Sequence, residues 1–247
     1  MNARLVARGV ATLTVTAGLG LAGSVAVDAA GTPTPSPTAT PVTVPNTAAL
    51  ATLKVHCDVA VQRRLSTLAV DNTFVKDSGA VTGTDQTTLE AQIGADEVGL
   101  TALDTTIQGD TTYHQAWTDC QTIVTGYRVY VLEDPKIDEV IAADGITTVD
   151  ATFATLIPEL QALINNASVS ATVKAQAQAD LNDLTSKVST SHTSISGVSA
   201  SVIGLTPAGW PGNQVDLKSA QQNIKTAHSD LDGASADANK IIKLLGA

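Results

Sequence analysis

Apolar residues recur three and four positions apart along almost the whole chain from residue 46 to the C-terminus. This spacing places them on one face of an α-helix, whereas a half-buried β-strand would alternate apolar and polar residues. The first such stretch has its recurring positions at Leu50, Leu53, Cys57, Val61, Leu65 and Leu68. The pattern therefore predicts an all-α protein.

Turn and capping residues divide the pattern into about six predicted helices. Gly204 is typical of a helix end, Asp110 and Asn213 are candidate N-caps, and Asp134-Pro135 combines a carboxylate cap with a proline at the first helical position. The predicted ranges are 46–76, 84–109, 110–131, 134–165, 173–204 and 213–247. Because the turns are short, neighbouring helices should run antiparallel, and we expect one elongated antiparallel bundle domain over residues 46–247.

One part of the third range favours a different structure when taken alone. Residues 122–132, TIVTGYRVYVL, are rich in β-branched and aromatic side chains, which are typical of a buried strand. A single strand among helices would leave its backbone hydrogen-bonding groups without partners. The helical interpretation is therefore preferred for this segment.

The N-terminus has the pattern of an export signal. Arg4 and Arg8 precede a long stretch without charge, and small residues suit cleavage after Ala29 or, as an alternative, after Ala26. Residues 1–29 are thus predicted to be a signal peptide, and the alternative is an uncleaved membrane anchor. Residues 30–45 form a predicted disordered Pro/Thr-rich linker, because proline fixes φ and removes backbone donors.

The charge balance restricts the partners. The chain has 24 acidic and 14 basic residues, a formal net charge of −10. Nucleic-acid binding requires a basic surface, and an anionic membrane would repel this one. We therefore expect no nucleic-acid partner, and membrane association only if the signal segment is retained as an anchor.

The two cysteines are expected to form a disulfide. An exported chain with one pair of cysteines most simply bonds them to each other. With about 1.5 Å of rise per residue along the first three predicted helices, Cys57 and Cys120 come to within about one turn of the same height. The alternative, two buried free thiols, is less favoured.

The sequence shows no catalytic or cofactor motif, such as Gly-x-Ser-x-Gly, Cys-x-x-Cys or His-Glu-x-x-His. His56 and His114 lie near the cysteines, but four scattered histidines are more often surface residues than metal ligands. We predict no enzyme activity, no cofactor and no metal.

Aromatic residues are scarce in the chain, at 3 % of its residues, and most of them gather around the third predicted helix. The candidate ligand-binding residues there are Tyr113, Trp117, Tyr127, Arg128 and Tyr130. Such a cluster favours either a ligand groove or, more commonly, the core of a central helix.

Three segments carry a resemblance to other proteins: LKVHCDVAVQRRL around Cys57, DCQTIVTGYRVYVLEDPK around Cys120, and LTPAGWPGNQ before the last helix. Through them the chain resembles a group of secreted all-helical proteins of high-GC Gram-positive bacteria that have no assigned activity. The resemblance implies export and helices and transfers no catalytic residue.

Together these features indicate a secreted protein, extracellular or associated with the cell envelope, that acts as a structural or interaction module with a protein or cell-wall partner. The alternative is an extracellular small-molecule binding protein that uses the aromatic groove on the third helix.

Overall fold

The computed structural model describes residues 46–246, which are helical with short connections and contain no strand. The all-α prediction and the disulfide are confirmed. The predicted signal peptide, 1–29, and the linker, 30–45, lie outside the described residues. The helices are α2 (Asn46–Asp77), α3 (Gly83–Gly109), α4 (Tyr113–Thr125), the π-helix η1 (Val129–Glu133), α5 (Asp134–Asn166), α6 (Ala171–Ile195), α7 (Val198–Ile203), the 3₁₀ turn η2 (Pro207–Gly209) and α8 (Asn213–Leu245).

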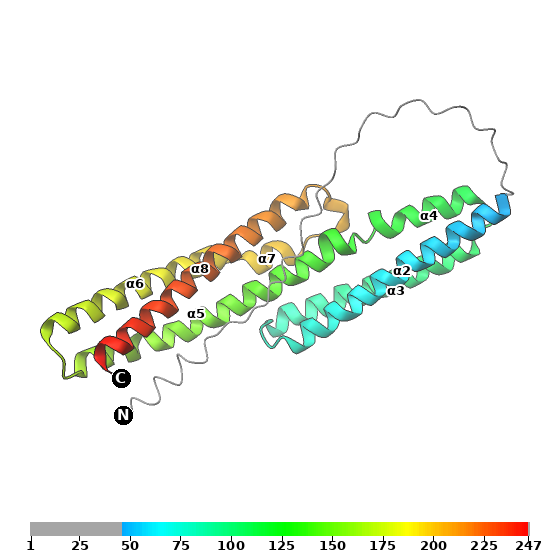
Figure 1. The fold of residues 1–247 in the computed structure, drawn as a ribbon. Helices are drawn as coiled ribbons and strands as arrows, with labels where there is room; N and C mark the ends of the chain where they lie inside the picture. Colours follow the sequence, from blue (N-terminus) through cyan, green and yellow to red (C-terminus); the bar gives the residue numbers. More distant parts are fainter. Residues whose placement is uncertain (1–45, 247) are drawn as a thin grey trace, which may run out of the picture.

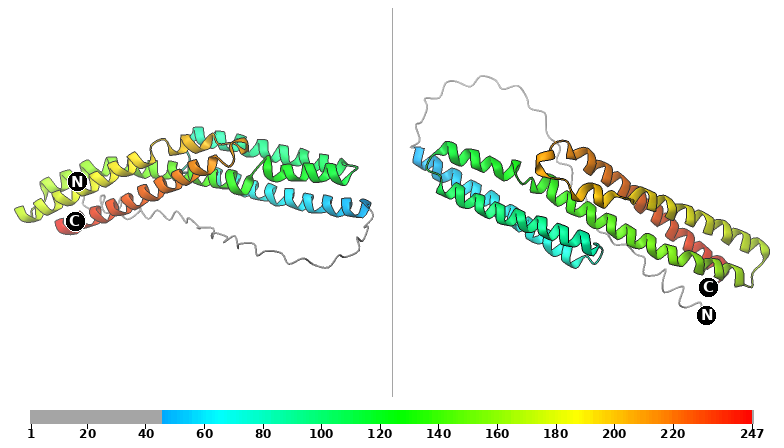
Figure 2. Two further views of the ribbon diagram at one scale, coloured as in Figure 1. Left: turned by 90° about the horizontal axis from the view of Figure 1, so that it is seen from above. Right: turned by 180° about the vertical axis from the view of Figure 1, so that it is seen from behind.

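The helices form two groups whose inner ends overlap, where α2 packs on α5 and α3 packs on α7 (Figure 1). One group contains α2, α3 and α4, and the other contains α5, α6, α7 and α8. Both further views show the same arrangement (Figure 2). A single cluster of buried apolar side chains nevertheless runs through both groups, from Leu53 in α2 to Ile241 in α8.

The two groups share one helical run, and here the structure differs from the sequence prediction. The third and fourth predicted helices were expected to reverse direction near Asp134, whereas α4, η1 and α5 continue in one direction (Figure 1). The run is interrupted only between Gly126 and Arg128, where Arg128 takes a left-handed conformation with φ 47°. The π-helix then leads directly into α5 without a turn.

Three predicted caps were wrong for local reasons. Thr112, not Asp110, caps α4, and its hydroxyl accepts a hydrogen bond from Gln115 N at 3.3 Å. Asp134 caps nothing, because α5 continues the preceding π-helix. Asn213 is the first residue of α8 and is buried, and its side-chain amide donates to Thr206 O at 2.6 Å, which closes the preceding loop instead.

The fifth predicted helix is also divided. Instead of continuing to Gly204, α6 ends at Ile195, and Gly197 adopts φ 75° before α7 begins at Val198. Glycine takes this left-handed conformation without steric cost, so Ser196-Gly197 can interrupt the helix.

One helical stretch among the described residues, Tyr113–Asn166, is long and apolar enough by length and composition to cross a membrane. In the structure this stretch is the element that both helix groups share. A helix that packs against neighbours at several faces needs such an apolar composition.

Candidate functional site

The candidate site lies where α2 and α4 begin side by side, at the outer end of the first helix group (Figure 1). The disulfide between Cys57 and Cys120 joins these two helices, with 5.7 Å between the Cα atoms. Cys57 is fully buried, and Cys120 is partly buried against the same core. The bond therefore fixes the spacing of α2 and α4 directly beside the site.

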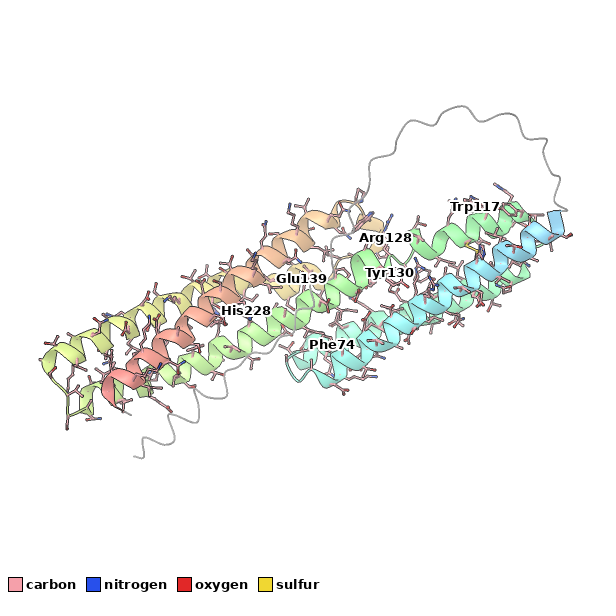
Figure 3. All side chains as sticks on the ribbon, in the orientation of Figure 1. Phe74, Trp117, Arg128, Tyr130, Glu139 and His228 are labelled. Atoms are coloured by element: carbon pink, nitrogen blue, oxygen red, sulfur yellow. A yellow bond between two sulfur atoms is a disulfide. The ribbon has the colours of Figure 1, made fainter. Side chains whose placement is uncertain are left out.

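A shallow groove of about 390 Å³ follows the first turns of α2. It is lined by Ala48, Ala49, Thr52, Leu53, His56, Tyr113 and Trp117. The rings of Tyr113 and Trp117 are nearly parallel, at 9°, with centroids 6.5 Å apart. Both residues are exposed, with 38 % of Tyr113 and 47 % of Trp117 accessible to solvent. We call this the Tyr113–Trp117 groove (Figure 3 labels Trp117).

The structure does not bring the other three predicted ligand residues to this groove. Tyr127 is half-buried and packs on the backbone of α3 at Gly99. Tyr130 lies under the Arg64 guanidinium of α2, which is 4.8 Å from the ring centroid. Arg128 lies at the break between α4 and η1, and its guanidinium stacks over the ring of Trp210. Tyr127, Tyr130 and Arg128 thus lie in environments separate from the groove that Tyr113 and Trp117 share.

The sequence prediction missed the α2 wall of the groove. Thr52 and His56 supply its polar side chains, and the Thr52 hydroxyl already donates to Ala48 O at 3.0 Å, so its oxygen is left to accept. The expected disulfide could have identified these residues of α2. If Cys57 meets Cys120, then the residues just before Cys57 must face those just before Cys120.

A second polar cluster lies where α2 meets α5. Asp71 of α2 is buried near Asp134 and Asp138 of α5, and its Oδ2 atom has no hydrogen-bond partner among the described residues. Burial raises the pKa of Asp71 to about 7, and the negative charges of Asp134 and Asp138 add to the shift. Burial also raises the pKa of Asp134. Protonation removes the charge of Asp71 and gives this buried carboxyl group a hydrogen-bond donor.

The two helix groups are tied by further polar contacts at their junction. Asp144 of α5 accepts a hydrogen bond from Thr82 N, at the start of α3, at 2.8 Å. Ser199 of α7 donates to Asp85 at 2.5 Å, and Gln92 of α3 donates to Ile203 O at 2.9 Å. These directional bonds fix how the first group is oriented on the second.

Within residues 46–246, no three His, Cys, Asp or Glu side chains gather as a metal site requires. His56 lines the groove, whereas His114 is exposed on α4.

Comparison with protein-family models, with curated proteins and with solved structures gave no match.

Proposed function

We propose that the protein is a secreted or cell-envelope helical module that acts by spacing or interaction rather than by catalysis. The observation that carries the proposal is the helical run α4–η1–α5, which joins the two helix groups. A shared helix and a junction held by hydrogen bonds resist bending. Such a body keeps its two ends at a fixed separation, as a spacer requires.

An exposed apolar strip on α2 supports the interaction part of the proposal. Val70 is 65 % and Phe74 is 51 % exposed, and both line a shallow depression together with neighbours on the same helix (Figure 3 labels Phe74). Val55 and Val59 extend the exposed apolar side chains toward the start of the helix. Val70 and Phe74 thus form a small exposed apolar patch, and such patches are typical of a face that meets a partner.

The proposed location and partner are tested together by fractionating the host cells into wall, membrane and medium. We expect the exported protein in a cell-associated fraction, and we expect Val70→Ser with Phe74→Ser to move it to the medium. Val215→Ser on α8 is a matched control, because Val215 is 73 % exposed and lies outside the strip. Recovery of the unaltered protein from the medium alone would contradict an envelope-bound spacer.

The second candidate function is extracellular binding of a small molecule in the Tyr113–Trp117 groove. The two exposed, nearly parallel rings with a hydroxyl and an imidazole beside them favour it, because ligand sites combine apolar surface with a few polar groups. Native mass spectrometry of protein purified from its host tests this candidate. A retained small molecule that is lost in Trp117→Ala supports it, and bare protein speaks against it.

A further inference from the structure

The Tyr113–Trp117 groove begins where the proline-rich part of the chain ends. Its α2 wall starts at Ala48, and α2 itself begins at Asn46. The sequence immediately before the helix is GTPTPSPTATPVTVP, residues 31–45. A segment that can pack on aromatic rings is therefore covalently attached at the edge of an aromatic groove.

The chemistry of the segment matches that of the groove. Proline-rich segments adopt the polyproline II conformation and are recognised by grooves lined with aromatic side chains, which contact the proline rings. Tyr113 and Trp117 offer two such rings, both exposed. Residues 31–45 carry no charge, and the groove is lined by no Asp, Glu, Lys or Arg side chain, so docking would leave no charge unpaired.

The segment is long enough to turn back and cover the groove. From Ala48 to His56 the groove follows α2 for about 12 Å, at about 1.5 Å per residue. About four residues of polyproline II helix, at about 3.1 Å each, cover that length. The rest of residues 31–45 remains for the reversal before Asn46.

We infer that residues 31–45 dock in cis into the Tyr113–Trp117 groove of the same chain as a polyproline II helix. Attachment to α2 gives the segment an effective concentration of the order of millimolar, so a contact too weak for a free peptide is still populated. The segment of a second copy lacks this advantage. Docking fills the groove independently of either proposed function, and any other ligand of the groove has to displace the segment.

A spin label on the segment tests the contact. Because the chain's two cysteines are bonded to each other, Ser36→Cys gives the exported protein a single reactive thiol for a nitroxide. The two tryptophans give two indole N–H signals, which Trp210→Phe assigns. We expect strong paramagnetic broadening of the Trp117 signal and much less of the Trp210 signal. The baseline for tethering alone is the same label in a chain with Pro33→Gly, Pro35→Gly, Pro37→Gly and Pro41→Gly.

Solvent access to Trp117 gives an independent readout. In a Trp210→Phe background Trp117 is the only tryptophan, and acrylamide quenches its fluorescence according to exposure. With a segment affinity near the effective concentration, the groove is about half occupied, so the quenching constant should be about twofold lower with the native segment than with the four glycines. Replacing Thr32, Thr34, Thr38 and Thr40 by serine keeps the prolines and should retain the protection.

Two results would overturn the inference. The first is equal broadening and equal quenching of Trp117 with the native and glycine segments. The second is protection that grows with protein concentration together with a dimer in sedimentation, because the occupant would then be the segment of a second copy. Protection that is constant over a hundredfold dilution of a monomer supports docking in cis.

Discussion

The Arg128 guanidinium lies 5.3 Å from the centroid of the Trp210 ring and connects the break in the central helical run to the loop before α8. Arg128 is the residue with φ 47°, a conformation that costs a non-glycine residue energy. Its Nε atom is buried and has no hydrogen-bond partner within residues 46–246. Stacking on Trp210 therefore contributes to holding the break in place and to keeping α4 and α5 in one direction.

A double-mutant cycle measures this contact. Arg128→Gln and Trp210→Leu should show a coupling of about 0.5–1 kcal/mol in the free energy of unfolding, as expected for a cation–π pair near the surface. Arg64→Gln combined with Trp210→Leu is the control, since Arg64 stacks on Tyr130 instead. Coupling in the Arg128 pair no larger than in the control pair would show that the stacking is not stabilising.

Asp71 makes stability depend on pH. Its pKa is raised from 3.8 to about 7 in the folded protein, so the folded state binds this proton more tightly than the unfolded state. The stability that protonated Asp71 contributes is fully present below about pH 4 and is lost as the pH rises through about 7. Asp71→Asn should have little effect at about pH 4 and should stabilise the protein above pH 7 by an amount on the order of 1–4 kcal/mol.

Urea unfolding at about pH 4.5 and about pH 8 gives the two free energies of unfolding. Asparagine has nearly the same shape as the protonated acid and carries no charge, so packing is kept. Glu159→Gln is the matched control, because it neutralises an exposed carboxylate on α5. Its effect on the free energy of unfolding should be the same at both pH values. A gain from Asp71→Asn that is equal at both pH values would refute the assignment.

Several features of this structure could be predicted from the sequence because they depend on one helix at a time. Each helix buries one stripe, so the spacing of Leu53, Cys57, Val61 and Leu68 identifies core residues that are buried in the structure. The disulfide was expected from a single cysteine pair in a chain with an export signal, and helix rise brings Cys57 and Cys120 to similar heights.

Other features depend on contacts between distant segments. The positive φ of Arg128 and the single direction of α4 and α5 accompany the packing of Arg128 on Trp210, which no local pattern indicates. Asp71 is buried where α2 meets α5, a contact between segments that are distant in the sequence.

Lys136 and Glu133 form an ion pair at 2.5 Å with side chains that are 2 % and 5 % exposed. Lys136→Met leaves the Glu133 charge buried and unpaired, and should destabilise the protein by about 3–5 kcal/mol. Adding Glu133→Leu should recover most of the lost stability. Thermal or urea unfolding of both variants measures the two effects. Lys240→Met removes the more exposed of the two lysine partners of Asp237 and should cost less than about 1 kcal/mol. A double variant less stable than Lys136→Met would contradict this account.

Substitution by alanine should have opposite effects on stability at two glycines of α3. A Cβ on Gly94 meets nothing within 4 Å, so Gly94→Ala should stabilise the protein by about 1 kcal/mol through helix propensity. A Cβ on Gly99 would lie 2.5 Å from Tyr127 Oη and 2.9 Å from Cε1, so Gly99→Ala should destabilise it by about 1–3 kcal/mol through overpacking. Tyr127→Leu removes the clashing atoms and should recover part of the loss in the Gly99→Ala background. Equal stabilisation by both alanines would show that Tyr127 does not pack on α3. The Tyr127 ring could then belong to the aromatic ligand groove that the sequence predicts.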